Sequence, residues 1–340
     1  METTFHIVEH QDLTFMRICI FGAGAVGSHF AVRLALAGHD VSCVMRGPHL
    51  EAVKAKGLTL RVDNAEFSAR VRASDDPAAL GPQDIVISTL KATGLRSLAA
   101  GLRPLLCDDT AVVFAQNGIP WWYDIGLPPD QPPPPDLAFL DPGGPLRAAV
   151  SPQRIVGGVI FSSNEIAAPG IVVNDSPERN MLLVGECDDR AGERIQRLRT
   201  ALDGALIQSP AVPRIREAIW TKLISNMSVS VLCMLTAKTA RAAVEDPALQ
   251  DVVSRMLDEA QSIARSCYPD ATRGSGAAPI HRPSLLQDYE RGRPMEIDAL
   301  VRAPQAFARA AGLVTPTLDV FAALAICRAR DKGLYQDKAI

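Results

Sequence analysis

Short apolar runs alternate with helix-like spacing through the first part of the chain. Residues 17–21 (RICIF) and 41–45 (VSCVM) are runs typical of strands buried in a parallel sheet. Between them, Phe30, Leu34 and Ala37 recur at the spacing of one helix face, and a glycine then ends the helix. The pattern predicts a strand–helix–strand unit at the start of a doubly wound α/β sheet.

The alternation continues beyond this unit. Apolar runs at 84–89 and 110–118 predict two further buried strands, with a helix around 94–101 between them. Shorter alternating runs over 57–74 predict a β-hairpin. The later elements that we expect to complete the same sheet are strands at 154–163, 170–175 and 180–186, a helix at 191–205 and a short strand at 206–210.

Helical periodicity replaces this alternation from Arg214 onward. We expect helices at 214–235, 246–266, 284–292, 296–312 and 315–333, with a Gly- and Pro-rich break at 269–283. The predicted fold class is therefore α/β, with an N-terminal Rossmann-type doubly wound sheet and a C-terminal all-helical domain. The expected boundaries are an N-terminal extension at 1–15, a sheet domain at 16–212 and a helical domain at 213–340.

Prolines cluster between residues 120 and 147, including four in a row at 132–135. Because proline fixes φ and donates no backbone hydrogen bond, this segment is expected to be a long loop rather than a helix or a central strand. Long loops in compact domains are usually functional or disordered. Since the loop begins with the pair Trp121–Trp122, we interpret it as part of the wall of a ligand pocket.

The composition narrows the class of protein. The chain has 340 residues, of which 47% are hydrophobic and 21% charged, a net charge of -3, and seven cysteines with no CxxC pair. No basic surface favours nucleic acid, no apolar run reaches the length of a membrane span, and the N-terminus does not resemble a secretory signal. We expect a cytoplasmic protein with no nucleic-acid partner, no membrane partner and no metal site, and a homodimer stays open.

The first predicted strand ends in a G-x-G-x-x-G motif formed by Gly22, Gly24 and Gly27. The first glycine makes a tight turn, the second lets the backbone approach a pyrophosphate, and the third allows close packing of helix and strand. The free N–H groups at the helix N-terminus favour the same anion. Because a strand precedes the motif and a helix follows it, we predict that a dinucleotide binds this segment, including Ala23, Ala25 and Val26.

The end of the second predicted strand indicates which dinucleotide binds. Enzymes that use NAD usually carry Asp or Glu there, but this strand ends Met45-Arg46-Gly47. A guanidinium can form a fork on a 2′-phosphate, whereas a carboxylate would repel it. Arg46 therefore favours NADP(H), and a solvated arginine at a strand end is the alternative interpretation.

Lys222 is the one charged residue in the apolar stretch 219–236 (IWTKLISNMSVSVLCMLT). Asn226 and Ser230 follow at i+4 and i+8, so the three polar side chains are expected on one helix face. A lysine on such a helix either extends its ammonium into solvent or is buried for a chemical role. Three aligned polar groups on one face raise the weight of the chemical role, so that the two interpretations are about equally favoured.

Several motifs together resemble the ketopantoate reductase family. They are the glycine motif, a Lys-Ala pair after the third Rossmann strand, QNG at 116–118, W-x-K-L-x-x-N from Trp220, PSLLQD at 283–288 and GRPMEID at 292–298. The resemblance runs from about residue 16 to about residue 330. It implies the following roles: Lys222 as proton donor, Glu296 as a catalytic residue near the cofactor, Asn226 and Ser284 as substrate contacts, and Lys91 and Asn117 as contacts on the nicotinamide side.

The chemistry of such a reductase suits these residue types. Hydride transfer to C2 of a 2-oxo acid builds negative charge on its carbonyl oxygen, which a buried ammonium can stabilise and then protonate. Burial lowers the pKa of a lysine and eases that donation. Other interpretations stay open for single residues: Ser284 as a helix N-cap, and Glu296, Asp288 and Asp298 as solvated helix charges.

The sequence departs from the family pattern at Ser230, where an asparagine followed by a proline is typical. A hydroxyl has a shorter reach and fewer donors than an amide, which affects the substrate pocket. We therefore expect an NADPH-dependent reductase of a 2-oxo acid, foremost of 2-dehydropantoate to (R)-pantoate in pantothenate biosynthesis. The alternatives are a related reductase of another oxo acid or an imine, and a protein that binds NADPH without catalysis.

Overall fold

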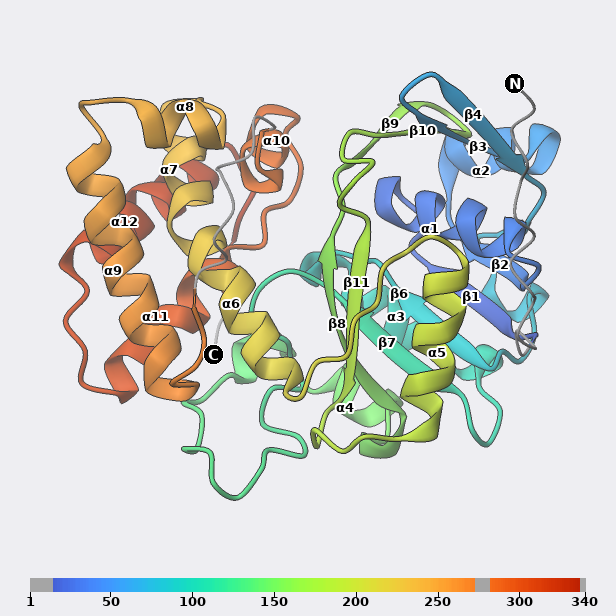
Figure 1. The fold of residues 1–340 in the computed structure, drawn as a ribbon, viewed down its shortest axis with the longest axis horizontal. Coiled ribbons are helices and arrows are strands. Elements are labelled where there is room, and N and C mark those ends of the chain that lie inside the picture. The colour runs from blue at the N-terminus through green and yellow to red at the C-terminus, as the bar shows by residue number, and fades with distance from the viewer. Residues whose placement is uncertain (1–14, 273–281, 337–340) are drawn as a thin grey trace, which may run out of the picture.

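The computed structural model describes residues 15–272 and 282–336, and it places a sheet domain beside a helical domain (Figure 1). In the described part of the chain, every strand precedes Ile215 and only helices follow it. The predicted fold class is therefore confirmed. The expected extension at 1–15 lies outside the described residues apart from Phe15, as does part of the expected break at 269–283.

A seven-stranded sheet forms the centre of the first domain, in the order β11-β8-β7-β6-β1-β2-β5. All its pairings are parallel except that of β11 with β8. Its strands are β1 (Arg17–Phe21), β2 (Asp40–Val44), β5 (Arg72–Ser74), β6 (Ile85–Ser88), β7 (Ala111–Ala115), β8 (Ile155–Phe161) and β11 (Met181–Glu186). The helices of this domain are α1 (Ala25–Leu36), α2 (Gly47–Lys56), α3 (Leu95–Gly101), α4 (Pro145–Ala149) and α5 (Glu193–Gly204).

The strand order reverses at β1. The chain passes from β1 through α1 to β2 on one side, and β6 lies on the other side of β1. Sheets of this kind bind ligands where the order reverses, beyond the carboxyl ends of the strands. The carboxyl ends of β1 and β6 are therefore where the fold itself places a binding crevice.

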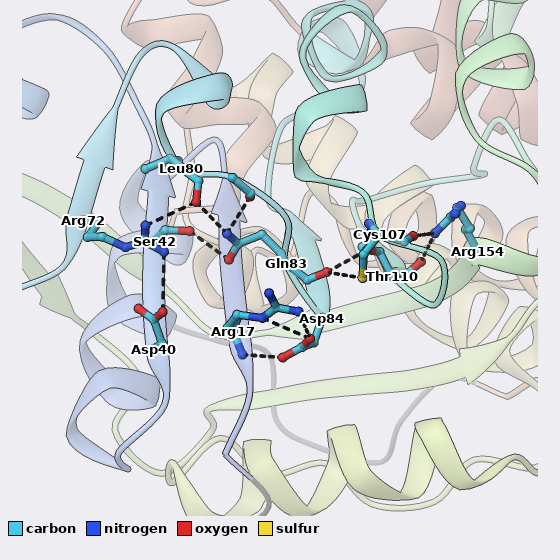
Figure 2. A network of polar contacts seen from close by, with 11 residues as sticks. Arg17, Asp40, Ser42, Arg72, Leu80, Gln83, Asp84, Cys107, Thr110 and Arg154 are labelled. Carbon is cyan, nitrogen blue, oxygen red and sulfur yellow. Dashed lines mark hydrogen bonds and ion pairs between the residues drawn. The ribbon is translucent and has the colours of Figure 1, made fainter.

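Side chains close the opposite, amino edge of the sheet (Figure 2). Arg17, the first residue of β1, donates from its backbone N–H and its guanidinium to the carboxylate of Asp84, just before β6. The hydroxyl of Thr110, just before β7, donates to the carbonyl oxygen of the buried Gln83 over 2.7 Å. This edge is occupied by the protein's own polar groups, so the carboxyl edge is the one that is left for a ligand.

A second, four-stranded sheet corrects part of the sequence interpretation. Its order is β4 (Ala65–Ala69), β3 (Leu58–Val62), β10 (Ile171–Asn174) and β9 (Asn164–Ala168). The expected hairpin is confirmed over β3 and β4, but the end of its run forms β5 and pairs with β2 in the main sheet. The strand expected at 170–175 pairs with β3 and not with the main sheet. The strand expected at 206–210 does not form; this run makes only an isolated parallel β-bridge, between Gln208 and Met181. Short apolar runs predict that a strand exists, but they do not specify its partner.

The helical domain contains α6 (Ile215–Met227), α7 (Val229–Thr236), α8 (Ala240–Glu245), α9 (Gln250–Cys267), α10 (Ser284–Glu290), α11 (Ala303–Ala310) and α12 (Pro316–Asp331). The first expected helix is interrupted at Ser228, whose backbone is not helical (ψ -84°), so it forms two helices. A π-helical turn at Asp298–Arg302 precedes α11. Pro304 removes a backbone donor at that point, which accounts for the irregular turn.

One stretch of the described residues, Ile215–Thr236, has the length and hydropathy of a membrane span. The helix break at Ser228 interrupts it, and 56% of its most apolar window is buried inside the protein. Figure 1 shows α6 at the junction of the two domains. Its apolar character is therefore explained by packing in the core, as in other buried helices.

The proline-rich segment starts in the core and not over a pocket. Trp121, Trp122 and Tyr123 are all buried, and Arg216 from α6 stacks on the last two rings at 5.2 and 5.5 Å. Fully buried rings cannot touch a substrate, so the interpretation of the tryptophan pair as a pocket wall is wrong. The segment also contains the short helix α4, which proline at the first helical position permits.

Arg216 is a buried cation that joins the two domains. Its side chain is 0% exposed, and its guanidinium donates to the backbone carbonyl oxygens of Tyr123, Ile125 and Cys187 over 2.6–2.8 Å. Removing the guanidinium would leave two buried acceptors and one partly buried acceptor without this donor. Each such acceptor costs about 1–3 kcal/mol.

We expect Arg216→Met to lower the free energy of unfolding by roughly 3 kcal/mol, measured by urea denaturation, because two buried carbonyl groups and one partly buried carbonyl group lose their donor. Arg190→Met is the matched control, since the side chain of Arg190 is 87% exposed and should change stability little. Equal effects of the two substitutions would show that Arg216 does not hold the domains together.

Candidate active site

The glycine turn after β1 combines two tightly packed glycines with one open one. Gly22 has φ +87°, and a Cβ there would lie 2.4 Å from Leu90. A Cβ on Gly27 would lie 2.5 Å from the hydroxyl of Thr89. A Cβ on Gly24 would meet nothing closer than 3.8 Å. The protein itself therefore requires the first and third glycines, whereas the space beside Gly24 is free for a ligand to approach the backbone.

Ala23, Ala25 and Val26 lie in this same turn and the first turn of α1, which places all six predicted residues of the motif at the carboxyl edge. Ala23 is buried, and Gly24 is the N-cap of α1, with no side chain to bond the free N–H groups of the helix. These N–H groups and the helix dipole suit a phosphate.

Arg46 lies two residues after Val44, whose carbonyl oxygen accepts from the N–H groups of Gly22 and Ala23 in the glycine turn. It follows β2, caps the N-terminus of α2 and is exposed. Its side chain is thus free to reach a phosphate group on a bound nucleotide.

His49 in α2 is a residue that the sequence analysis missed. The Ser28 hydroxyl donates its proton to the carbonyl oxygen of Ala23. It must therefore accept from His49 Nε2, which lies 3.0 Å away. The N–H of Gly170 donates to the other ring nitrogen, Nδ1, over 3.0 Å. Burial lowers the pKa of His49, consistent with this neutral ring. The imidazole therefore fixes the starts of α1 and α2 relative to each other, a contact with no local sequence signal.

Lys222 faces the carboxyl edge from α6. Its ammonium donates to Asn117 Oδ1 over 2.7 Å and to the carbonyl oxygen of Ile160, and it lies 5.2 Å from the ring centre of Phe161. Burial lowers the pKa of Lys222 to about 8, and the negative charge of Glu296 opposes that effect. Lys222 is partly buried, and its ammonium is bonded to protein oxygens rather than extended freely into solvent.

Glu296 is buried and not the solvated helix charge that was one alternative. It is 4% exposed, and its Oε1 accepts from the N–H of Ala92 over 2.9 Å. Burial raises the pKa of Glu296, while the hydrogen bonds from Ala92 and the Asn117 side chain lower it. Asn117 therefore lies between the carboxylate and the ammonium of Lys222.

Lys91 pairs with Asp288 across the two domains. Asp288 is 3% exposed and burial raises its pKa, so the expectation of a solvated charge is wrong. The same holds for Asp298, which is buried and accepts from the hydroxyl of Tyr335 over 2.7 Å. The helix pattern alone could not show that Lys91 from the sheet domain lies against Asp288, or that Tyr335 lies against Asp298.

The three remaining predicted residues lie on helices of the second domain. Asn226 lies one turn after Lys222 in α6 and is half-buried, but Ser230 lies in α7, beyond the break at Ser228. The expected continuous row of three is therefore interrupted. Ser284 is exposed and is the first residue of α10, whose N-cap is Pro283, so the N-cap interpretation of this serine is wrong. Helices α7 and α10 pack against each other.

The arrangement can bind a dinucleotide along the glycine turn and can donate a proton from Lys222 to a small molecule beside it. No group of three or more potential metal ligands occurs in residues 15–272 and 282–336. Fold and site together define a two-domain oxidoreductase that uses a nicotinamide dinucleotide.

The chain belongs to the ketopantoate reductase family. The family model "Ketopantoate reductase PanE/ApbA" matches residues 18–121, and its C-terminal counterpart matches residues 214–326. A 2-dehydropantoate 2-reductase of Mesorhizobium japonicum is 41% identical over 94% of this chain and 100% of its own length. A second protein of that name, from Archaeoglobus fulgidus, is 27% identical over 83% of this chain and 87% of its own length.

Solved structures agree with this assignment. A protein from Ralstonia solanacearum with a solved crystal structure is 33% identical to this chain in sequence. The two structures superimpose with a TM-score of 0.83, over 95% of this chain and 100% of the other. A PanE/ApbA family ketopantoate reductase from Ralstonia eutropha is 25% identical in sequence. Its structure superimposes with a TM-score of 0.75, over 93% of this chain and 99% of the other. The resemblance inferred from the sequence motifs is confirmed.

Proposed function

We propose that the protein reduces 2-dehydropantoate to (R)-pantoate with NADPH, a step of pantothenate biosynthesis. The observation that carries the proposal is the setting of Lys222, a buried ammonium with a pKa of about 8 at the carboxyl edge of the sheet. The names of the relatives in Mesorhizobium japonicum and Archaeoglobus fulgidus support this substrate. The seven unpaired cysteines support a reducing location such as the cytoplasm.

In this proposal, the bound cofactor supplies a hydride to C2 of the oxo acid. Lys222 stabilises the negative charge that develops on the carbonyl oxygen and then gives that oxygen its proton. Asn117 and the carbonyl of Ile160 hold the ammonium in position. Glu296 keeps Lys222 protonated near neutral pH, because its charge opposes the effect of burial on the lysine.

The other predicted residues have supporting roles in the proposal. Asn226, on the same helix as Lys222, would bind the substrate, as would Ser230 and Ser284 from α7 and α10. Lys91 would lie beside the nicotinamide, since it follows β6 at the same edge. The open space beside Gly24 would accept the pyrophosphate.

The choice of NADPH over NADH rests on Arg46. We expect kcat/KM to be higher with NADPH, and we expect Arg46→Glu to lower the NADPH value by roughly 10- to 100-fold, because a charged hydrogen bond is lost and a like charge is added. The NADH value should change much less. Arg103→Glu, an exposed arginine after α3, is the control. An equal or higher kcat/KM with NADH in the wild type would contradict the assignment.

A substrate panel tests the proposed reaction. NADPH oxidation is followed with 2-dehydropantoate, other 2-oxo acids and cyclic imines as substrates. The proposal predicts the highest kcat/KM for 2-dehydropantoate. A higher value for another compound would identify a different reductase on the same scaffold, and tight NADPH binding without turnover of any compound would mean that the protein is not a reductase.

A further inference from the structure

Arg179 is a cation at the carboxyl edge of the sheet that no sequence motif identified. It lies in the turn between β10 and β11, two residues before the first residue of β11. Its side chain is exposed, and none of the ion pairs among residues 15–272 and 282–336 involves its guanidinium. It is therefore available to an anion from solution.

The turn that carries Arg179 is held by a set of internal hydrogen bonds. The N–H of Ser163, just after β8, donates to the hydroxyl of Ser176 over 2.8 Å. The N–H of Arg179 donates to the carbonyl of Ser176 over 3.0 Å, and the buried Asn180 donates from its side chain to the carbonyl of Pro177 over 3.0 Å. The backbone at Arg179 is therefore preorganised next to the end of β8.

The side chain of Arg179 shares one aromatic ring with Lys222. The guanidinium carbon lies 4.9 Å from the ring centre of Phe161, the last residue of β8, and the ammonium of Lys222 lies 5.2 Å from the same centre. Both distances are typical of cation–π contacts. Of the two cations, Lys222 faces the carboxylate of Glu296, whereas no ion pair within the described residues includes Arg179. Two positive charges around one ring favour an anionic ligand.

The chemistry of a 2-oxo acid matches this pair of cations. Its carbonyl and carboxylate groups are on adjacent carbons, so a carbonyl oxygen at Lys222 brings the carboxylate within a few ångströms of the same ring. A guanidinium has a planar fork of donors that can bind both oxygens of a carboxylate. A serine hydroxyl such as that of Ser284 offers one donor and no charge.

We propose that Arg179 binds the carboxylate of the 2-oxo acid and makes the enzyme selective for acids over neutral carbonyl compounds. The inference rests on the proposed function, since it assumes that a 2-oxo acid reacts beside Lys222. Arg179 is then a specificity-determining residue supplied by the β10–β11 turn of the sheet domain, in addition to the substrate contacts of the helical domain.

The test compares Arg179→Met and Arg179→Lys with the wild type, and uses 2-dehydropantoate and its neutral amide as the two substrates. We expect Arg179→Met to raise KM for the acid by about 10- to 100-fold with a smaller change in kcat, because a charged contact made before the transition state is lost. Arg179→Lys should have an intermediate KM. For the amide, kcat/KM should be nearly the same in the wild type and in Arg179→Met.

The control is Arg190→Met, an exposed arginine beyond the other end of β11, which should leave KM for the acid unchanged. The dissociation constant for NADPH, measured by fluorescence, should stay the same in all variants and shows that they are folded. A second readout is the pH at which kcat/KM for the acid falls. The charges that act on Lys222 are those of Glu296, which raises its pKa, and Arg179, which lowers it. Removing the positive charge of Arg179 should therefore raise the pKa of Lys222 and shift the fall in kcat/KM to higher pH.

Two results would overturn the inference. One is a KM for 2-dehydropantoate in Arg179→Met that stays within about twofold of the wild type, and the other is an equal loss on acid and amide. Failure of the proposed function has a different signature, because the wild type itself would then reduce no 2-oxo acid.

Discussion

Lys222→Met should lower kcat for 2-dehydropantoate by about 10²–10⁴-fold, the usual contribution of a positioned general acid. Methionine keeps the apolar packing of the lysine stem in α6 and removes only the ammonium that contacts Asn117 and Ile160. The dissociation constant for NADPH should not change, because the glycine turn lies in the other domain. Steady-state NADPH oxidation gives kcat, and titration of the same preparation with NADPH, followed by fluorescence, gives the dissociation constant.

The pH dependence of the wild type gives an independent check on the same residue. Lys222 must be protonated to act as the acid, and burial lowers its pKa to about 8. The value of kcat/KM for the reduction should therefore be constant below that pH and fall as pH rises through about 8. A native kcat in Lys222→Met, or a profile without this fall, would exclude the lysine as proton donor.

Gly24→Val should leave the fold intact and weaken NADPH binding by about 100-fold or more, since hydrogen bonds to a charged group contribute about 1.5–3 kcal/mol each and about 1.4 kcal/mol is a factor of ten in affinity. Gly24 has a negative φ of -79°, although its ψ of -148° lies just outside the main β region, and a Cβ there meets nothing of the protein closer than 3.8 Å. The added side chain would instead occupy the space that the pyrophosphate needs. Isothermal titration with NADPH measures the loss.

Gly27→Val is the informative comparison for this experiment. Its Cβ would lie 2.5 Å from the hydroxyl of Thr89 and 2.8 Å from Ile20, so this variant should lose thermal stability as well as cofactor binding. Gly24→Val should melt near the wild-type temperature. If Gly24→Val binds NADPH as tightly as the wild type does, the dinucleotide does not lie along the turn.

Most of the fold could be predicted from the sequence because its signals are local. The run 17–21, the three glycines and the helical spacing after them predict β1, the turn and α1 within one short stretch. The interruption of the helix at Ser228 and the pairing of β10 with β3 were not predictable in the same way. The pairing of β10 with β3 joins residues far apart in the chain, and short apolar patterns carry no information about such partners. The side chain of Ser228 donates to the carbonyl oxygen of Ile224 one turn earlier, a contact that a helical pattern does not reveal either.

In the candidate site, too, local sequence predicts some features and contacts between distant residues determine the others. The positions of Lys222 and the glycine turn followed from local motifs, whereas the burial of Glu296 and Asp288 depends on the approach of the other domain. Gly118 shows how close that approach is. It has φ +82°, and a Cβ there would lie 2.5 Å from the carbonyl oxygen of Ala299. The glycine of the QNG motif is therefore required where the two domains touch.

Arg216, His49 and Arg179 had no sequence signal for a related reason. Each is an ordinary residue of a helix or turn, and each acquires its role from carbonyl groups, a hydroxyl or a ring that lies elsewhere in the chain. A single sequence contains the residue types but not these partners.

The most direct test of the account is a product balance with the purified protein. NADPH and 2-dehydropantoate are incubated with the enzyme, and pantoate formed is measured by mass spectrometry against NADPH consumed. The account predicts one pantoate, of the R configuration, for each NADPH, and at least about 100-fold less pantoate with Lys222→Met over the same time. Consumption of NADPH without pantoate, or full binding of NADPH with no reaction, would contradict it.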